Sequence, residues 1–75
     1  MSRAQLEKRY GIAIRDDSYY NPYTFKWVKG YRIYTADGCQ WENGLRTLKD
    51  VANECAKWSD RILKIKETVE SYKDI

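Results

Sequence analysis

The side chains that enzymes use most often for catalysis are scarce in this chain. It contains no histidine, the commonest general base and a frequent metal ligand. Asp16 and Asp17 are adjacent carboxylates, but they lie in a run of turn-forming residues, 16–22, so a loop explains them better than an acid–base pair does. Cys39 and Cys55 lack the further ligands that a structural zinc site needs, and no base stands beside Cys39 to activate its thiol. We expect no enzymatic activity, no bound metal and no cofactor.

Residues suited to binding are more frequent. The chain has three Trp, seven Tyr and one Phe, and aromatic side chains carry much of the binding energy of protein interfaces. Three basic residues, at positions 26, 29 and 32, lie in a stretch without an acidic residue between positions 17 and 37. Two adjacent tyrosines stand in the loop before that stretch. The residues that we expect to contact a partner are Lys26, Lys29, Tyr31, Arg32, Ile33, Tyr19 and Tyr20.

Residues 23–42 are predicted to hold these side chains on three antiparallel strands. Apolar and polar residues alternate around Lys29-Gly30 and Asp37-Gly38, and two-residue turns with glycine are the commonest hairpin connections. Because the side chains of a strand alternate between its faces, one face collects most of the aromatic residues and is predicted to be the core. That face consists of Tyr23, Phe25, Trp27, Tyr34, Ala36, Cys39 and Trp41. The other face, which includes Tyr31 and Ile33, is predicted to meet water.

Two alternatives would change this assignment of faces. The second turn could be a three-residue loop with Gly38 in a left-handed conformation, which would move Trp41 to the opposite face. The N-terminal helix could also pack on the open face through Leu6 and Tyr10, which would bury that face. We favour the two-residue turn and the open face.

A short helix and a short strand are predicted before this sheet. Ser2 and Gln5 have the spacing of a capping box, and Gly11 is a natural end for a helix within residues 1–11. Residues 12–15 alternate in polarity and are predicted to form a strand at the flank of the sheet.

The end of the chain is predicted to form a long helix over residues 47–72. Thr47 followed by Asp50 fits an N-cap, and apolar residues then recur at alternating spacings of three and four. These residues are Leu48, Val51, Cys55, Trp58, Ile62, Ile65, Val69 and Tyr72. Such a helix, about 37 Å long at the rise of an α-helix, exceeds a strand of about 20 Å. It therefore either breaks near residues 59–60 or extends to a partner, which includes a homodimer through residues 58–72.

Together these elements predict one α+β domain over residues 1–75. It has a short N-terminal helix, a three- to four-stranded antiparallel sheet within residues 12–42, and a long C-terminal helix packed on the aromatic face of the sheet. No apolar run approaches the roughly 18 residues of a transmembrane helix, and the N-terminus lacks the apolar segment of a signal peptide. We expect a cytoplasmic protein with reduced cysteines and no contact with a membrane.

Two binding functions fit this architecture. A sheet backed by a helix, with its other face open and a basic hairpin, suits a nucleic-acid groove or a stacking platform for bases. In architecture alone it resembles the sheet-plus-helix domains of certain plant transcription factors and phage integrases. The net charge of +3 is small for such a domain. A small aromatic-rich chain without catalytic residues also resembles the accessory proteins of phages and mobile elements. That resemblance implies stoichiometric inhibition of a host defence system, for example an anti-CRISPR role.

Of these two functions, we favour non-catalytic, stoichiometric protein binding of inhibitor character. The expected partner is another protein or a protein–nucleic acid complex. Direct binding of nucleic acid by the basic hairpin is the alternative.

Overall fold

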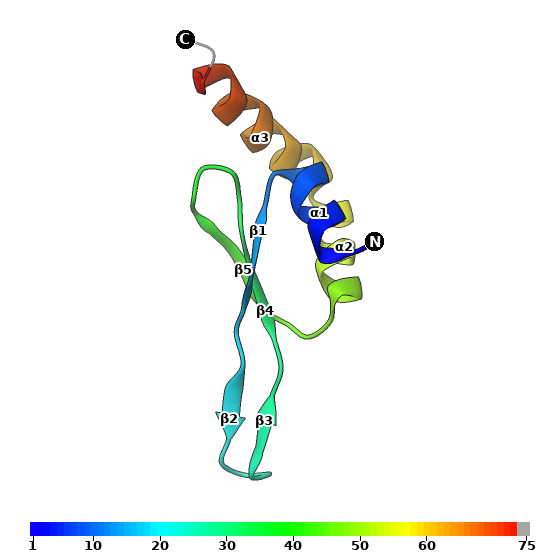
Figure 1. Cartoon of the computed structure of the whole chain (residues 1–75), viewed down its shortest axis with the longest axis vertical. Coiled ribbons are helices and arrows are strands. Elements are labelled where there is room, and N and C mark those ends of the chain that lie inside the picture. Colours follow the sequence, from blue (N-terminus) through cyan, green and yellow to red (C-terminus); the bar gives the residue numbers. More distant parts are fainter. Residues whose placement is uncertain (74–75) are drawn as a thin grey trace.

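The computed structural model describes residues 1–73 and confirms the mixed α+β architecture (Figure 1). The elements, in chain order, are α1 Arg3–Tyr10, β1 Ala13–Asp16, β2 Tyr19–Asn21, β3 Lys26–Val28, β4 Tyr31–Tyr34, β5 Gln40–Leu45, α2 Leu48–Lys57 and α3 Ser59–Lys73. Strands β1, β4 and β5 form an antiparallel sheet in the order β1-β4-β5, and β2 and β3 form a separate two-stranded sheet. The molecule is elongated, 51 × 21 × 18 Å.

The two sheets are successive parts of one long hairpin. The β1–β4 and β2–β3 ladders share the same register, and a hydrogen bond from the Asp17 amide to the Gly30 carbonyl oxygen (2.9 Å) joins them. Residues 13–34 therefore run out and back as a single ribbon. Its outer half projects away from the helices (Figure 1), and we call residues 19–28 the arm.

The hairpin turn lies at residues 22–25, so the predicted turn at Lys29-Gly30 is wrong. Asn21 starts the real turn by accepting a hydrogen bond on its side-chain Oδ1 from the Tyr23 amide, at 2.9 Å. Gly30 is buried in a straight part of the chain, where a Cβ atom would lie 3.0 Å from the Asp17 carbonyl oxygen. Glycine is thus needed there for close approach of two strands. The prediction of a loop over residues 16–22 is also wrong, because β2 lies within it.

The turn between β4 and β5 is the three-residue loop, not the favoured two-residue turn. The Thr35 amide donates to the Cys39 carbonyl oxygen (3.0 Å), and the Gly38 amide donates to the Thr35 carbonyl oxygen (2.9 Å). Gly38 has φ +82°, the left-handed conformation that closes such a loop. As the alternative requires, Trp41 turns toward the core, where its ring meets that of Trp58 edge to face at 6.3 Å.

The core lies between the three-stranded sheet and the helices, on the face that the sequence assigned to water. Tyr31 and Ile33 are buried there with Leu6 and Tyr10 of α1, whereas Trp27 is 72% exposed, so the predicted faces are inverted. The full buried cluster is Leu6, Tyr10, Ile12, Ile14, Tyr31, Ile33, Val51, Cys55 and Ile62. All three helices lie on this one side of the sheet (Figure 1). The physical cause is the position of the turn, which carries the aromatic residues of the arm beyond the reach of the helices.

Helix α1 has the predicted N-cap and also closes the outer edge of β1. Ser2 and Gln5 form the capping box, and Gly11 ends the helix at φ +65°. The Glu7 carboxylate accepts a hydrogen bond from the Ile14 amide at 3.0 Å, and the Arg3 guanidinium donates to the Ile14 carbonyl oxygen. One turn of helix therefore supplies the hydrogen bonds that a neighbouring strand would supply.

The predicted helix over residues 47–72 is two helices that meet at Trp58. Thr47 and Asp50 form the N-terminal capping box of α2. The Trp58 amide still donates to the Glu54 carbonyl oxygen (3.1 Å), but Trp58 has φ −114° and leaves the helical conformation. Helix α3 follows at once and extends past the end of the three-stranded sheet (Figure 1).

None of the helices within the described part of the chain has both the length and the apolar character required to span a membrane.

Candidate binding surface

The arm carries a dense group of exposed aromatic side chains. Tyr23 is 92%, Phe25 78% and Trp27 72% exposed, and Tyr19 and Tyr20 are about half exposed. These five residues fall within nine positions of the chain and lie at the end of the molecule opposite α3 (Figure 1). Contiguous exposed apolar surface of this kind typically marks an interaction site.

These aromatic side chains surround the ribbon. Tyr20 and Trp27 face each other across the two strands and form an edge-to-face pair, with ring centroids 5.6 Å apart and ring planes at 74°. Tyr19 lies on the opposite face, because successive side chains of a strand alternate. Tyr23 and Phe25 extend from the turn at the tip. The arm therefore offers aromatic surface on both faces and at its end.

Phe25 holds a strained backbone conformation at the tip. Its φ of 55° makes it the one non-glycine residue with positive φ within residues 1–73. A bulky residue in this region costs on the order of 1–3 kcal/mol, and such strain concentrates at functional positions. The strain projects an aromatic ring from a position where glycine or asparagine would be the relaxed choice.

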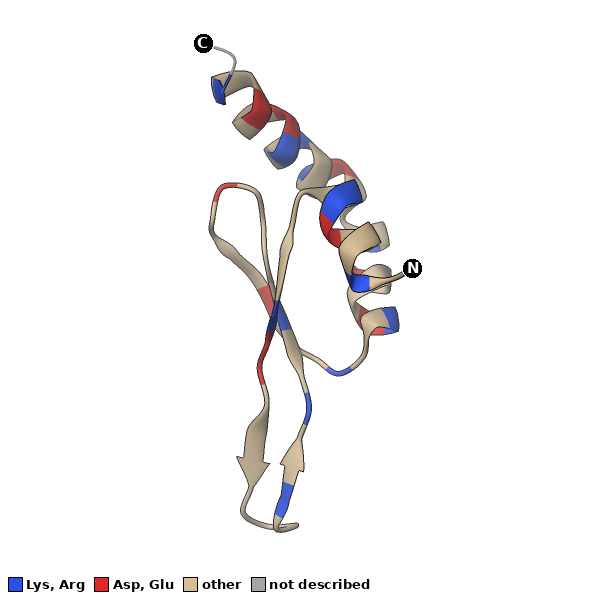
Figure 2. Ribbon diagram, viewed as in Figure 1, with Lys and Arg blue, Asp and Glu red and all other residues tan. Residues whose placement is uncertain are grey.

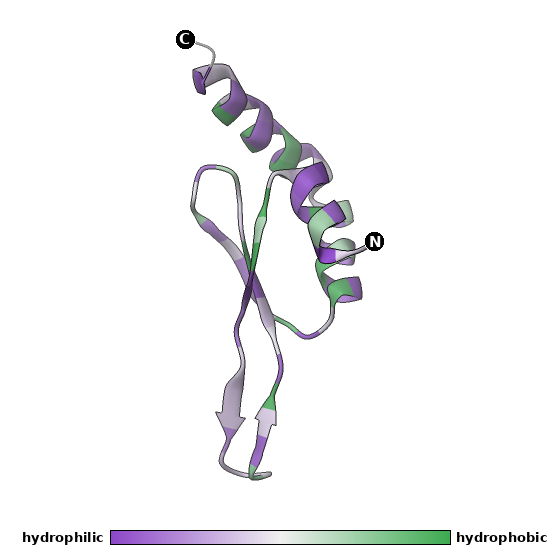
Figure 3. Ribbon diagram, viewed as in Figure 1, coloured by the Kyte–Doolittle hydropathy of each residue, from purple (hydrophilic) through white to green (hydrophobic). Residues whose placement is uncertain are grey.

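The charge of the arm is entirely positive. Lys26 and Lys29 are exposed, and no acidic residue lies between positions 17 and 37 (Figure 2). The Lys29 ammonium sits 5.5 Å from the centre of the Tyr31 ring, at the root of the arm. In Figure 3 much of the arm is pale purple, because the hydropathy scale rates tyrosine and tryptophan as mildly hydrophilic. The surface is thus aromatic and basic, and mildly hydrophilic by that scale.

The structure separates the seven predicted site residues into two groups. Tyr19, Tyr20, Lys26 and Lys29 are exposed on the arm or at its root. The prediction is wrong for Tyr31 and Ile33, which are 8% and 0% exposed and belong to the core. Arg32 is half-buried, with its guanidinium 5.8 Å from the centre of the Tyr34 ring and its Nε without a hydrogen-bond partner.

Sequence reasoning missed Tyr23, Phe25 and Trp27, which it placed in the core. A signal for them was present. Asn21-Pro22 favours a turn, and a hairpin turn there leaves the residues that follow it at an exposed tip.

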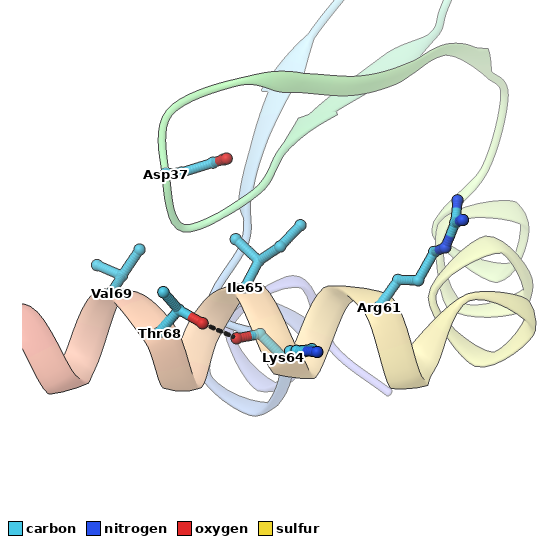
Figure 4. Close-up of a pocket in the computed structure, with 6 residues that line it drawn as sticks. All are labelled: Asp37, Arg61, Lys64, Ile65, Thr68 and Val69. Atoms are coloured by element: carbon cyan, nitrogen blue, oxygen red, sulfur yellow. Dashed lines mark hydrogen bonds between the residues drawn. The ribbon is translucent and has the colours of Figure 1, made fainter.

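A groove lies between α3 and the β4–β5 turn (Figure 4). It has a volume of about 360 Å³ and is lined by Asp37, Arg61, Lys64, Ile65, Thr68 and Val69. The side chains of Ile65 and Val69 point toward the turn, and Thr68 donates a hydrogen bond to the Lys64 carbonyl oxygen at 2.8 Å (Figure 4). The groove is apolar at its floor and has cationic residues on its helix side.

The carboxylate of Asp37 serves its own turn. It accepts hydrogen bonds from the Thr35 hydroxyl (2.5 Å) and from the Cys39 amide (3.2 Å). These bonds, the one from Thr35 foremost, lower the pKa of Asp37. Asp37 therefore holds the loop that forms one wall of the groove.

The two thiols differ in accessibility. Cys39 is exposed and free, and Cys55 is buried and free. Burial, with a smaller effect of the nearby Glu54 charge, raises the pKa of Cys55 to about 11. Among the residues that the structure describes, no three His, Cys, Asp or Glu side chains gather as a metal site would require.

Comparisons with protein-family models, with curated proteins and with solved structures found no match to this chain.

Proposed function

We propose that this chain is a non-catalytic protein that binds another protein stoichiometrically, with the arm as its contact element. The observation that supports this most is the exposure of Tyr23, Phe25 and Trp27 at the end of a projecting ribbon. Tryptophan and tyrosine are enriched among the residues that dominate binding energy, and they lose little conformational entropy on binding. An aromatic projection fits a concave apolar surface on a partner.

A protein partner is favoured over nucleic acid by the arrangement of the rings. Successive bases stack on parallel, accessible ring faces. Tyr20 and Trp27 instead lie at 74° to one another, so the edge of one ring covers part of the other. The arm has Lys26 as its one cation and Lys29 at its root, which is few for a surface that follows a phosphate backbone.

Nucleic-acid binding is the alternative, and one observation favours it. A two-stranded ribbon fits the major groove of DNA, and the outer part of this ribbon, residues 18–34, has lysines but no acidic residue. The test is an anisotropy titration of labelled duplex and single-stranded DNA at about 50 and about 200 mM salt, between which phosphate-dependent binding weakens steeply. Micromolar binding that weakens with salt and is lost in Lys26→Gln/Lys29→Gln would replace the protein proposal with this one.

The proposal has three further parts. A binder of this size without catalytic groups would act by covering a functional surface of its partner, which is the inhibitor character that the sequence analysis expected. A cytoplasmic location is supported by the free, exposed thiol of Cys39, since free cysteines are typical of reducing compartments. A homodimer through residues 58–72 is supported by the length of α3 beyond the sheet and by the 73% exposure of Tyr72.

The proposal is tested by affinity capture from a lysate of the source organism. The bait is the full chain, compared with Tyr23→Ser/Phe25→Ser/Trp27→Ser and with a surface control, Lys49→Ser, at an exposed position of α2 outside both the arm and the proposed dimer contact. We expect a partner polypeptide that the full chain and the control retain and the arm variant loses. Equal capture by all three baits would contradict a role for the arm.

A further inference from the structure

The edges of the two sheets are protected to different degrees. The outer edge of β1 is covered, because Arg3 and Glu7 hydrogen-bond the Ile14 backbone. The outer edge of β5 is interrupted by shifts of register against β4 and by Gly44, which has a φ of +71°. Such devices prevent a sheet from pairing with another chain. The arm has no comparable protection, since within residues 1–73 β3 has β2 as its one neighbouring strand.

The backbone groups on the open edge of β3 can be assigned from the register. The Gly30 carbonyl oxygen points toward β1, because it accepts a hydrogen bond from Asp17. Along an antiparallel strand, residues whose N–H and C=O point to one side alternate with residues whose groups point to the other. The backbone N–H and C=O groups of Tyr31 therefore point toward β5, with which Tyr31 pairs. The backbone groups of Lys29 and Trp27 point to the same side. At these two residues no strand of the described chain is present to pair.

The empty position beside β3 is the continuation of the path of β5. Strand β5 pairs with β4 as far as Leu45, opposite Tyr31, and the chain then turns away through Arg46 to α2 (Figure 1). A further strand in line with β5 would reach the backbone of Lys29 and then of Trp27. An isolated two-stranded ribbon is only marginally stable in water, so a third strand would also stabilise the arm.

The charges beside this position are basic. Lys26 and Lys29 lie on the ribbon, and the exposed Arg46 stands where β5 ends (Figure 2). Acidic residues nearby have partners elsewhere in the fold or lie on the other strand. Asp16 and Asp17 belong to the other strand of the hairpin, with Asp16 within 3.8 Å of Arg3, and the Asp50 carboxylate accepts hydrogen bonds from the Arg46 and Thr47 amides at 3.3 and 3.2 Å. An incoming segment with carboxylates would complement these cations.

We propose that β3 binds an extended, acidic segment of the partner protein by strand addition. The segment pairs with the outward N–H and C=O groups of Trp27 and Lys29, alternates apolar residues with Asp or Glu, and places the apolar residues against the aromatic rings of the arm. Recognition of this kind takes affinity from main-chain hydrogen bonds and specificity from alternate side chains. This inference rests on the proposed function, and it names the kind of segment that is bound.

The test uses a displayed library of random twelve-residue peptides selected on the full chain. We expect enriched peptides in which apolar residues occupy every second position with Asp or Glu between them. A synthetic enriched peptide is then titrated by fluorescence anisotropy against the wild type and a matched pair of variants. Lys29→Gln removes the charge and keeps the amide N–H, whereas Lys29→Pro also removes the N–H.

The expected affinities separate the hydrogen bond from the charge. We expect Lys29→Gln to bind within about threefold of the wild type and Lys29→Pro to bind roughly tenfold more weakly than Lys29→Gln, since a lost hydrogen bond is worth about 1.4 kcal/mol or less. Should Lys29→Pro disturb the arm, the same loss is expected on the wild-type chain from a peptide N-methylated at alternate residues. Strand addition would be overturned by equal binding of the two Lys29 variants together with tolerance of N-methylation.

Two other outcomes also decide against strand addition. In the first, the enriched peptides have apolar residues at helical spacings of three and four, and they do not bind the Tyr23→Ser/Phe25→Ser/Trp27→Ser variant. This result would exclude an extended segment but would still support protein binding by the arm. A library that yields no enriched peptide overturns strand addition as well. The proposed function is tested separately, by the comparison of the full chain with the arm variant in the lysate capture.

Discussion

The Oε2 atom of Glu7 accepts a hydrogen bond from the backbone amide of Ile14 at 3.0 Å, from one turn of α1 to the edge of β1. Arg3, one helical turn earlier, donates to the carbonyl oxygen of the same residue. A buried or half-buried amide is costly to leave unpaired, so this pair of side chains both positions α1 and closes the sheet. The outer edge of β3, by contrast, has no neighbouring strand within residues 1–73.

Replacement of Glu7 by alanine is expected to lower the free energy of unfolding by about 1–3 kcal/mol, because the Ile14 amide loses its acceptor. Glu7→Gln keeps an acceptor oxygen and should recover most of the loss. Urea unfolding of the two variants measures the difference. If Glu7→Ala and Glu7→Gln were equally stable, the hydrogen bond would have no part in holding α1 on the sheet.

Replacing a side chain by alanine should affect the free energy of unfolding very differently on the two faces of the hairpin. Ile33→Ala removes a fully buried side chain and is expected to cost about 2–5 kcal/mol. Trp27→Ala removes a much larger side chain from an exposed position and should cost less than about 1 kcal/mol. Thermal unfolding of both variants provides the measurement. A Trp27→Ala variant as destabilised as Ile33→Ala would restore the face assignment that the structure inverts.

The strained backbone of Phe25 at the tip of the arm is expected to lower the free energy of unfolding. Because Phe25 has positive φ, Phe25→Gly should leave the free energy of unfolding unchanged or raise it by up to about 1 kcal/mol. Tyr23→Gly, at a neighbouring position without positive φ, should lower it by about 0.5–1 kcal/mol. Denaturant unfolding compares the two variants. A larger loss from Phe25→Gly than from Tyr23→Gly would mean that the ring of Phe25 stabilises the fold.

Cys55 is expected to make stability fall at alkaline pH. Its thiol loses a proton near pH 9 in the unfolded chain and near pH 11 in the folded chain, where burial raises its pKa. Between these values the folded state binds more protons, so stability falls as pH rises, by up to about 1.4 kcal/mol per pH unit.

The measurement is urea unfolding from about pH 8 to about pH 11 for the wild type and for Cys55→Ala, since subtraction removes the effects of Tyr and Lys titration. The wild type should lose more stability than the variant over this range. Parallel curves would show that Cys55 ionises alike in the folded and unfolded states.

The sequence predicted those elements whose signals are local. Ser2 and Gln5 form the predicted capping box, and Thr47 is the predicted N-cap, to which Asp50 adds a second capping box. A cap needs only its own first turn, so nothing elsewhere in the chain can overrule it. The C-terminal helix breaks at Trp58, close to residues 59–60, where the sequence left a break open as one of two alternatives.

The faces of the sheet could not be predicted in the same way, because both were apolar enough to be the core. The outcome depended on which glycine or asparagine made the hairpin turn. Gly30 resembles a turn residue in sequence, but it is required for a close approach to Asp17, which only the three-dimensional pairing reveals. With the turn displaced to residues 22–25, Trp27 leaves the core for the arm, and Tyr31 leaves the predicted site for the core.

The central claim is that the tip of the arm contacts a protein partner. The most direct measurement replaces Tyr23 by the photoreactive p-benzoylphenylalanine, with the same replacement at Tyr72 of α3 as control, and irradiates each protein in a lysate of the source organism. We expect a discrete protease-sensitive, nuclease-resistant adduct to another polypeptide from position 23, and from position 72 no adduct except a covalent dimer of the chain itself. A nuclease-sensitive adduct, or the same products from both positions, would contradict the claim.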